Sequence, residues 1–362
     1  MHPQAALEGI WYRPGAQARR HPLFWPLYAL SLPYGAAIGL RNRLYDGGGL
    51  PRTKLPCPVI SVGNLTVGGT GKTPLVMLLA ELMQEAGQRP AILSRGFGGR
   101  STRGVQVVSD GRRLLATPET AGDEPVLMAR TLPSVPVLTG PDRVRTGKVA
   151  LDRFGAKLLI LDDAFQHRRL VRDLDIVLAD LALPFGNGCL LPAGPLREPV
   201  QALKRARIVI RTGSEAEIRT SPASADAGGL RGFHRPRELI RGDGAERHPP
   251  AMLAGKRLLA FAGLGRPDAF RKTLAALGAE VADFLPFPDH HAYRRSDIEG
   301  IRQRAVAAKV EFIVTTEKDA VRLSPDWRAR VAVLPVTARF EDDAALDALL
   351  APIVSRMNPA HG

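Results

Sequence analysis

Residues 58–74 read PVISVGNLTVGGTGKTP, and this stretch decides the fold. An apolar run, predicted as a strand, leads into a glycine-rich turn, and Lys72 and Thr73 then open a predicted helix. Glycines let backbone N–H groups converge on an anion, and the positive end of the helix dipole points to the same place. The order of strand, glycine-rich turn and helix therefore predicts a loop that binds phosphate.

The predicted loop consists of Thr66, Val67, Gly68, Gly69, Thr70, Gly71, Lys72 and Thr73. The strict pattern GxxxxGK[ST] has glycine where this chain has Thr66, so the recognisable core is GGTGKT. In that pattern the lysine reaches the β- and γ-phosphates and the hydroxyl ligates Mg²⁺, roles that we assign to Lys72 and Thr73. The alternative is a glycine-rich turn before a helix that carries a lysine by chance.

Length and charge limit the class of protein. At 362 residues the chain exceeds the usual size of one domain, so we expect two. The formal net charge of +14 favours a polyanionic partner, either nucleic acid, an anionic membrane or a phosphorylated substrate. The arginines are scattered, so an arginine bias on solvated surfaces explains the charge equally well. Cys57 and Cys189, without metal-ligand spacing, are typical of a reducing compartment.

Residues 22–40 (PLFWPLYALSLPYGAAIGL) contain no charged side chain, and arginines lie on both sides of them. The run is just long enough to cross a membrane, but Pro26, Pro33, Gly35 and Gly39 are expected to interrupt a spanning helix. Its aromatic residues prefer the depth of the lipid headgroups. We therefore expect a helix in the membrane interface, with a single span and a buried core helix as alternatives.

Beyond the loop, short apolar runs alternate with helical segments, which is typical of a parallel sheet covered by helices on both faces. The predicted strands are residues 90–94, 135–140, 157–161, 175–180 and 207–212. We predict an α/β fold with a P-loop NTPase-like parallel-sheet domain, a second, smaller α/β domain and an N-terminal membrane-associated helix. The expected boundaries are 1–45 for the N-terminal segment, 46–215 for the nucleotide-binding domain, 216–250 for a connection and 251–362 for the second domain.

Acidic side chains after a buried strand are candidates for metal ligands. Asp162 and Asp163 directly follow the apolar run KLLIL, and a carboxylate at such a strand end holds Mg²⁺ in P-loop enzymes. Two adjacent acids are costly unless cations lie near them. We therefore predict Thr73, Asp162 and Asp163 as magnesium ligands. The alternative is that the two acids only cap the next helix.

Two further motifs carry groups that can accept a proton. Asp123 in GDEP is either a base for an attacking hydroxyl or a helix N-cap, and its neighbours do not separate the two. Asp289, His290 and His291 form a DHH triplet, which fits a metal site, a catalytic Asp–His pair and a surface loop equally well. The candidates for positive charge near the acceptor or the transition state are Arg95, Arg143 and Lys318. Each is a plain surface charge in the alternative interpretation.

Seven motifs, in this order, resemble the tetraacyldisaccharide 4′-kinases, which act in lipid A synthesis. They are VGNLTVGGTGKTP (62–74), SRGFGG (94–99), GDEP (122–125), LDDAFQH (161–167), LPAGPLREP (191–199), FPDHHAY (287–293) and TTEKD (315–319). The resemblance covers nearly the whole chain. One departure is Ala164, where the family usually has glycine, and a methyl group there would strain a positive φ.

This resemblance implies an enzyme at the cytoplasmic face of the bacterial inner membrane. It would use ATP and Mg²⁺ to phosphorylate the 4′-hydroxyl of an acylated glucosamine disaccharide 1-phosphate. The resemblance assigns the catalytic pair to Asp123 and His290, the magnesium carboxylates to Asp162 and Asp163, and nucleotide binding to residues 66–73. Further candidates for substrate binding are Arg95, Gln166 and Arg143.

The main alternative is a switch ATPase of the partitioning or targeting class, because it shares the GGxGKT loop. ATPases of the partitioning class carry a lysine just before the two glycines, where this chain has Val67, and they have no use for a DHH motif. A non-enzymatic adaptor driven by the basic charge would leave the loop unexplained. We expect no nucleic-acid partner, and we favour a monomer.

Overall fold

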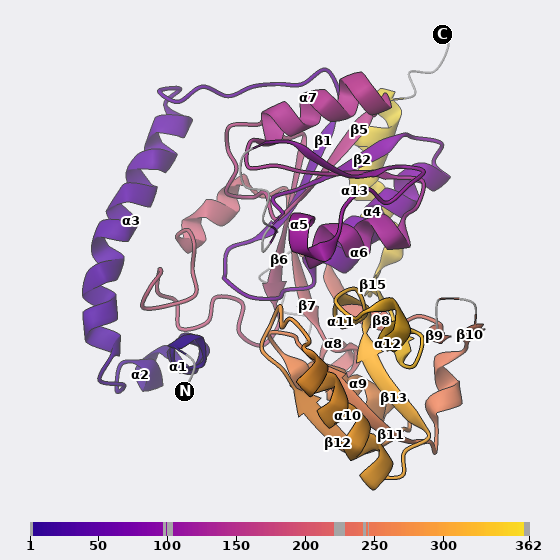
Figure 1. The fold of residues 1–362 in the computed structure, drawn as a ribbon. Helices are drawn as coiled ribbons and strands as arrows, with labels where there is room; N and C mark the ends of the chain where they lie inside the picture. Colours follow the sequence, from indigo (N-terminus) through magenta and orange to yellow (C-terminus); the bar gives the residue numbers. More distant parts are fainter. Residues whose placement is uncertain are drawn as a thin grey trace. The chain divides into compact units, whose positions relative to one another are not determined.

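The computed structural model describes residues 3–96, 99, 104–220, 229–241, 244 and 246–357. The chain divides into two compact units, which are described separately. The first comprises Met1–Arg95, Gly140–Phe233 and Arg339–Gly362, and the second comprises Gly96–Thr139 and His234–Ala338 (Figure 1). Residues 97 and 98 of the SRGFGG motif lie outside the described residues.

This division differs from the expected boundaries. The sequence places residues 96–139 in the nucleotide-binding domain, whereas they pack with residues 234–338. The last residues, 339–362, return to the first unit. The chain thus passes between the units more than once. Composition along the chain does not reveal such an exchange, because each inserted segment has the same strand and helix patterns as its neighbours.

The first unit is built on a parallel sheet, which confirms the predicted α/β fold. Its strands follow the order β8-β7-β6-β1-β5-β2, so the strand before the glycine-rich loop is central. The bounds are β1 (Val59–Asn64), β2 (Pro90–Ser94), β5 (Leu158–Asp162), β6 (Leu174–Asp180), β7 (Ile208–Gly213) and β8 (Arg231–Pro236). Every residue of β1, β2 and β5 is buried, as expected for parallel strands covered on both faces.

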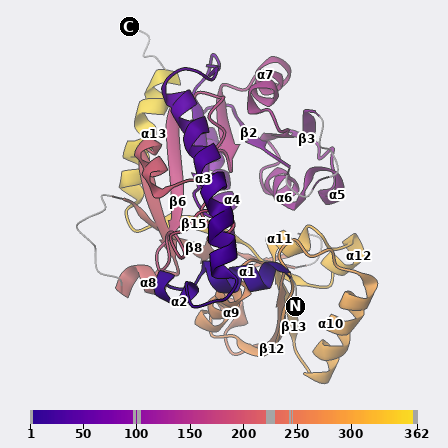
Figure 2. The same cartoon turned by 90° about the vertical axis from the view of Figure 1, so that its left-hand side faces the viewer.

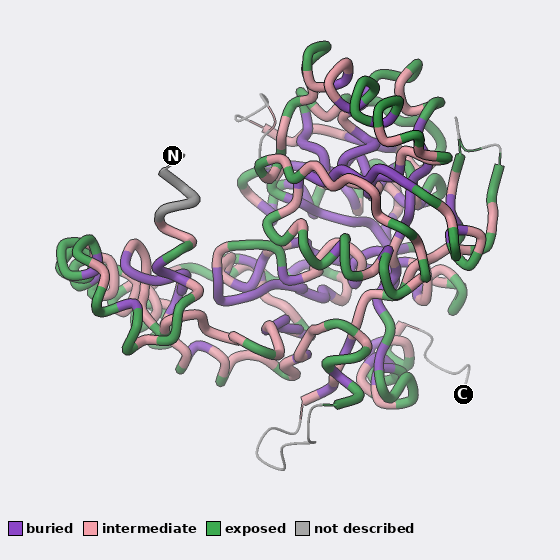
Figure 3. Tube along the Cα trace, turned by 90° about the horizontal axis from the view of Figure 1, so that it is seen from below, coloured by how far each residue is buried: buried purple, intermediate pink, exposed green. Residues whose placement is uncertain are grey.

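Helices cover this sheet. They are α4 (Lys72–Glu85), α7 (Arg143–Phe154), α8 (Glu215–Thr220), α13 (Asp343–Met357) and the 3₁₀ helix η1 (Val200–Arg205). The α4 helix packs on β1, β2 and β5 and buries its apolar side chains there. Asp142 caps α7 by accepting hydrogen bonds from the N–H groups of Val144 and Arg145. Figure 3 colours the chain by burial, with buried residues in purple and exposed residues in green.

The N-terminal segment is helical. It consists of α1 (Pro3–Trp11), α2 (Gly15–Ala18) and the 23-residue α3 (Phe24–Asp46), the long helix at the left of Figure 1. The expected interruption is wrong, because α3 continues through Pro33, Gly35 and Gly39. A proline inside a helix removes one backbone hydrogen bond, but the helix continues on both sides of Pro33. Among the described residues, no helix combines the length and apolar character needed to cross a membrane.

The second unit contains a six-stranded sheet with the order β10-β9-β14-β13-β11-β12. The last four are parallel, and β9 and β10 are antiparallel at one edge. The bounds are β9 (Leu239–Arg241), β10 (Glu246–His248), β11 (Arg257–Ala262), β12 (Glu280–Pro286), β13 (Phe312–Thr316) and β14 (Ala332–Leu334). Three strands, β8 to β10, thus lie in the expected connection 216–250. The strands β9 and β10 are too short for a periodic signal; β9 is fixed by pairing with β14, and β10 by pairing with β9.

Both faces of this sheet are covered. Leu258, Ala260 and Ala262 of β11 face one apolar cluster, and Leu259 and Phe261 face the other. The helices of the unit are α5 (Pro118–Ala121), α6 (Asp123–Thr131), α9 (Pro267–Ala276), α10 (Arg295–Ala307), α11 (Glu317–Ala320) and α12 (Pro325–Arg328). The first cluster includes side chains of α9 and the second includes side chains of α10. The strands β3 (Gln106–Asp110) and β4 (Pro136–Thr139) of this unit pair with each other in antiparallel orientation.

Candidate active site

The glycine-rich loop lies in the first unit, between the end of β1 and the start of α4 at Lys72. Gly68 has φ 115 and Gly71 has φ 79, conformations that side chains other than glycine rarely adopt. Gly71 is the residue before the helix, so the N–H groups of the first turn are left for an anion. The predicted strand, turn and helix are therefore present at the residues where the sequence places them.

Neighbouring backbone holds the loop from outside. The N–H of Val67 donates to the carbonyl of Pro195 (2.8 Å), and the N–H of Arg197 donates to the carbonyl of Leu65 (2.7 Å). At the other end of the loop, the Thr212 hydroxyl donates to the carbonyl of Thr70 (3.3 Å). These contacts hold the backbone of the loop near both of its ends. The motif LPAGPLREP, noted only as a family signature, supplies the first two.

The acid next to the loop is Asp163. Nη1 of Arg197 lies 2.9 and 2.8 Å from its two carboxylate oxygens, and Nζ of Lys72 lies 3.7 Å from one of them. Burial raises the pKa of Asp163, but the charges of Lys72 and Arg197 outweigh that effect and lower the pKa to about 2. Asp163, with φ 48, and not Ala164, is the left-handed residue of this turn. The methyl group of Ala164 therefore causes no backbone strain.

Asp162 is the last residue of β5 and is buried. Its carboxylate accepts a hydrogen bond from the hydroxyl of Ser94, the last residue of β2 (3.0 Å). The carboxyl ends of two neighbouring parallel strands thus meet here, which is where open α/β sheets bind ligands. Neither acid serves as an N-cap, because β5 is followed by an irregular turn and not by a helix.

The candidates for positive charge in the first unit differ in burial. Arg143 is 3% exposed, and Nη1 donates to the carbonyl of Gly140 (2.7 Å). Burial lowers its pKa to about 10, although the nearby charges of Asp162 and Asp163 raise it. A surface charge is thus excluded for Arg143. Arg95 is exposed directly after β2. The side-chain amide of Gln166 donates to the carbonyl of Asn64 (2.8 Å), which braces the end of β1.

The second unit brings Asp123 and His290 together. Nδ1 of His290 lies 3.0 and 3.1 Å from the carboxylate oxygens of Asp123, although 167 positions separate the two residues. Asp123 is the first residue of α6, and Gly122 occupies the N-cap position, so the N-cap interpretation of Asp123 is wrong. His291 turns away, since its Nε2 lies 2.9 Å from Asp297.

Arg322, which we did not predict from the sequence, also binds Asp123. Its guanidinium donates to the Asp123 carboxylate and lies 3.4 Å from Asp319. Burial raises the pKa of Asp123, but the hydrogen bond from His290 and the charges of Arg322 and Lys318 outweigh that effect and hold the pKa below its usual range. Asp123 is therefore a carboxylate at neutral pH. The signal was available, since Arg322 follows the TTEKD motif at the i, i+3 spacing from Asp319.

Asp319 anchors this arrangement. It is fully buried, and it accepts hydrogen bonds from the N–H of Gly263 (3.0 Å) and the hydroxyls of Tyr293 (2.8 Å) and Thr316 (2.5 Å). A buried carboxylate needs such partners, and here they come from the residue after β11, the segment 287–293 and the last residue of β13. The Arg322 side chain is therefore held rigidly against Asp123.

Lys318 lies beside the same pair. Its Nζ is 3.2 Å from Glu124, 3.0 Å from Asp289 and 3.4 Å from Nε2 of His290. Burial lowers the pKa of Lys318, but the charges of Glu124, Asp289 and Asp123 outweigh that effect and raise it. Lys318 is thus a largely buried cation, with a side chain 16% exposed, and not a plain surface charge. The two acids beside it and His290 keep it in one place.

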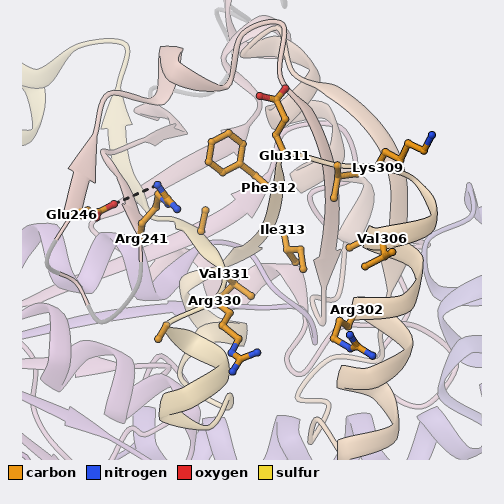
Figure 4. Close-up of a pocket in the computed structure, with 14 residues that line it drawn as sticks. Arg241, Glu246, Arg302, Val306, Lys309, Glu311, Phe312, Ile313, Arg330 and Val331 are labelled. Atoms are coloured by element: carbon orange, nitrogen blue, oxygen red, sulfur yellow. Dashed lines mark ion pairs between the residues drawn. The ribbon is translucent and has the colours of Figure 1, made fainter.

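A surface cavity of about 470 Å³ lies in the second unit, at the amino-terminal ends of β13 and β14 (Figure 4). Its walls carry Arg241, Arg302, Lys309 and Arg330. The Asp123–His290 pair is elsewhere in this unit, since α11 and the DHH segment follow the carboxyl ends of β13 and β12. No residue predicted for the site lines this cavity.

The site in the first unit shows to which class of protein the chain belongs. A glycine-rich loop with Lys72 and Thr73 joins a central parallel strand to a helix, and an acid ends the adjacent strand. This arrangement is that of a P-loop nucleotide-binding protein. Comparison with known proteins gives the family. The family model described as tetraacyldisaccharide-1-P 4′-kinase matches residues 23–355, and the chain belongs to that family.

The names of individual relatives agree with this family assignment. A tetraacyldisaccharide 4′-kinase of Syntrophus aciditrophicus is 51% identical over 331 residues, which cover 87% of this chain and 88% of the relative. A second tetraacyldisaccharide 4′-kinase, of Anaeromyxobacter dehalogenans (strain 2CP-C), is 43% identical over 362 residues. The aligned part covers 96% of this chain and 95% of the relative. A crystal structure described as the "apo" form of LpxK from Aquifex aeolicus in complex with ATP has a TM-score of 0.76 and 37% identity. It covers 92% of this chain and 99% of that one.

Proposed function

We propose that this chain transfers the γ-phosphoryl group of ATP to the 4′-hydroxyl of tetraacyldisaccharide 1-phosphate, with Mg²⁺ as the metal ion. The observation that carries the proposal is the buried Asp123 carboxylate, 3.0 Å from His290 Nδ1, in a chain that also has a phosphate-binding loop. The family and the names of the relatives support the acceptor, and the ATP complex of the Aquifex relative supports the donor.

The first unit would hold the donor. Phosphoryl transfer needs little covalent work from the protein, so positioning and neutralisation of charge dominate. The loop N–H groups and Lys72 would bind the phosphates, and the buried Arg143 guanidinium would add positive charge on the side of Asp162 and Asp163. Lys72 is already positioned by Asp163, 3.7 Å away. The assignment of residues 66–73 to nucleotide binding follows from this.

The residues at the predicted metal site fit Mg²⁺ by their chemistry. Mg²⁺ binds through one or two carboxylates and completes its octahedron with phosphate oxygens and water. Thr73, Asp162 and Asp163 offer such oxygens. Among the described residues no group of three or more His, Cys, Asp and Glu is placed to bind a metal, so the nucleotide would have to supply ligands. When bound, the ion would neutralise charge on the β- and γ-phosphates.

The second unit would activate the acceptor. The carboxylate of Asp123 would orient the attacking hydroxyl and take its proton, and His290 and Arg322 would fix that carboxylate. Its lowered pKa makes Asp123 a weak base. In a loose transition state the hydroxyl loses its proton late, so a weak, well-oriented base is sufficient. We assign Arg95 and Gln166 to substrate binding from the motifs in which they lie, SRGFGG and LDDAFQH.

The α3 helix would place the enzyme on the cytoplasmic face of the inner membrane. Its exposed large side chains have exposed fractions of 40–59%, which is unusual for apolar residues on one helix. They are Trp25, Tyr28, Leu30, Leu32, Leu40 and Leu44. An acylated substrate stays in the bilayer, so a kinase that acts on it must reach the membrane surface.

The test of the proposed function uses the purified full chain in detergent, with Mg-ATP and tetraacyldisaccharide 1-phosphate. We expect a lipid product heavier by one phosphate group, observed by mass spectrometry, and no product without ATP. Hydrolysis of ATP without a phosphorylated lipid would contradict the proposal and favour the switch ATPase.

A further inference from the structure

One segment of the first unit touches both the long N-terminal helix and the nucleotide loop. Residues 190–198, which we name the linking segment, lie between α3 and the parallel sheet (Figures 1 and 2). All contacts described below join residues of this one unit. The linking segment forms an antiparallel bridge between Leu196 and Thr66, the first residue of the loop.

Arg197 of the linking segment contacts Asp163 and the backbone just before the nucleotide loop. Its backbone N–H donates to Leu65, and its Nη1 lies 2.9 and 2.8 Å from the oxygens of Asp163. Asp163 in turn lies 3.7 Å from Nζ of Lys72. Arg197 therefore fixes the backbone just before the loop and, through Asp163, the lysine at its end.

On the other side, α3 holds the linking segment through polar side chains. The Tyr34 hydroxyl donates to the carbonyl of Arg197 (2.8 Å), and the Ser31 hydroxyl donates to the carbonyl of Leu190 (3.0 Å). Nη2 of Arg41 lies 2.7 Å from Oε1 of Glu198 and also donates to the carbonyl of Gln166 (3.2 Å). Gln166 and residue 163 lie in the same turn after β5, so Arg41 holds that turn as well as the linking segment.

Glu198 is the buried centre of this contact. Its side chain is fully buried, and it binds both Arg41 and Arg205, the latter at 2.6 Å. The Arg205 guanidinium lies over the ring of buried Phe165, 4.6 Å from its centroid. A carboxylate with no access to water is stable only in the geometry that satisfies it. The position of residue 198, and with it residue 197, therefore depends on Arg41 of α3.

We propose that Tyr34 and Arg41 of α3 are positioning residues for the nucleotide site, which act through Glu198 and Arg197 on Asp163 and Lys72. Neither residue would touch the nucleotide. The inference rests on the proposed function, because it takes residues 66–73 as the nucleotide site. One consequence is that the helix with the exposed apolar face also braces the site, so that nucleotide binding is complete only with α3 docked.

The test measures nucleotide affinity of the full chain, by calorimetric titration with ADP and with a non-hydrolysable ATP analogue, each with and without Mg²⁺. Arg41→Gln removes the contact with Glu198. Arg43→Gln removes the same charge two positions along the helix, where the side chain is exposed, and is the matched control. We expect Arg41→Gln to weaken nucleotide binding at least fivefold and Arg43→Gln to change it less than 1.5-fold. Arg41→Lys should restore part of the affinity.

A second pair of variants tests the same inference if Arg41→Gln does not fold. Tyr34→Phe removes only the hydroxyl bound to Arg197, and Tyr28→Phe makes the same change at an exposed position of α3. We expect a two- to threefold loss of nucleotide affinity for Tyr34→Phe and none for Tyr28→Phe, with thermal unfolding temperatures equal within a degree. Equal affinities for the two Phe variants would overturn the inference.

A double-mutant cycle separates positioning from a general effect on stability. Arg197→Gln is combined with Arg41→Gln and, as the control, with Arg43→Gln. If Arg41 acts through Arg197, the first pair weakens nucleotide binding much less than the product of the single effects, whereas the second pair is multiplicative. Multiplicative effects in both pairs would refute the inference. Because nucleotide affinity is measured without lipid, a chain that fails to phosphorylate the disaccharide would refute the proposed function alone.

Discussion

At the scale of single residues, two residues of the site have a backbone conformation that residues other than glycine rarely adopt. Asp163 has φ 48 and His290 has φ 60, although neither is glycine. Such backbone conformations cost about 1–3 kcal/mol each and persist only where the surroundings enforce them. Arg197 holds the side chain of the first, and Asp123 holds the side chain of the second. Strain at these two positions is consistent with functional roles for both residues.

Asp123 should be required for turnover but not for nucleotide binding. Asp123→Asn keeps the shape of the side chain and removes its charge and its ability to take a proton. We expect kcat to fall about 10²- to 10⁴-fold, the usual contribution of a general base. ATP affinity, measured by titration, should stay within twofold of the wild type. A variant with wild-type turnover would show that Asp123 is not the base.

Arg322 should set the acidic side of the pH–rate profile. Its charge helps to hold the pKa of Asp123 below the usual value, so Arg322→Gln should raise that pKa. Since the carboxylate is the active form, activity would then be lost at a higher pH on the acidic side. The measurement is kcat/KM for the lipid between about pH 4 and pH 8, around and above the ordinary pKa of an aspartate.

The matched control for this prediction is Arg295→Gln, which removes the same charge from an exposed position of the same unit. Its profile should coincide with that of the wild type. Arg322→Lys keeps the charge and should shift the acidic limb less than Arg322→Gln. Identical acidic limbs for all four proteins would mean that Arg322 does not act on Asp123.

At the scale of elements, α3 has two different sides. Ser31, Tyr34, Arg41 and Asn42 recur at helical spacing and bind the linking segment or its buried Glu198. The same helix carries large apolar side chains that remain exposed. A surface helix of a soluble protein usually turns apolar side chains to the core and polar ones to water. In α3 the polar side chains make the inner contacts and apolar side chains are exposed, which supports contact with lipid.

Substitution of the apolar side chains of α3 should weaken membrane binding. Trp25→Ser with Leu32→Ser removes two exposed groups, and burial of each is worth up to about 1.5–3 kcal/mol. A combined loss of only about 1.4 kcal/mol lowers the partition coefficient tenfold, which vesicle flotation detects. Leu114→Ser with Leu115→Ser, at exposed positions of the second unit, is the control. If both double variants float like the wild type, α3 does not bind lipid.

At the scale of the whole molecule, the net charge of +14 should contribute to membrane binding. Attraction between exposed arginines and anionic lipid is screened by salt, because the Debye length falls from about 10 Å at 0.1 M to about 3 Å at 1 M. We expect binding to vesicles with anionic lipid to decrease steeply over this range, while binding to neutral vesicles changes little. Flotation at several salt concentrations measures both. Equal salt dependence on the two vesicle types would assign the binding to apolar contacts alone.

The sequence by itself determined the features that depend on local physical chemistry. The roles of Gly68 and Gly71 could be predicted because a phosphate loop needs positive φ at a strand-to-helix turn. The buried strands β1, β2 and β5 were readable because parallel strands covered on both faces are continuous apolar runs. The candidates Asp123 and His290 came from motifs, whereas the residues alone left an N-cap and a surface loop as alternatives.

Only the tertiary structure decided which of these residues meet. His290, not His291, contacts Asp123 across 167 positions, and Arg322 reaches the same carboxylate across 199. Residues 96–139 join the second unit, and short strands replace the expected connection. Contacts between distant segments depend on how whole elements pack, and no local periodicity records that packing. For the same reason the contact of Arg41 with buried Glu198 could be found only in the folded chain.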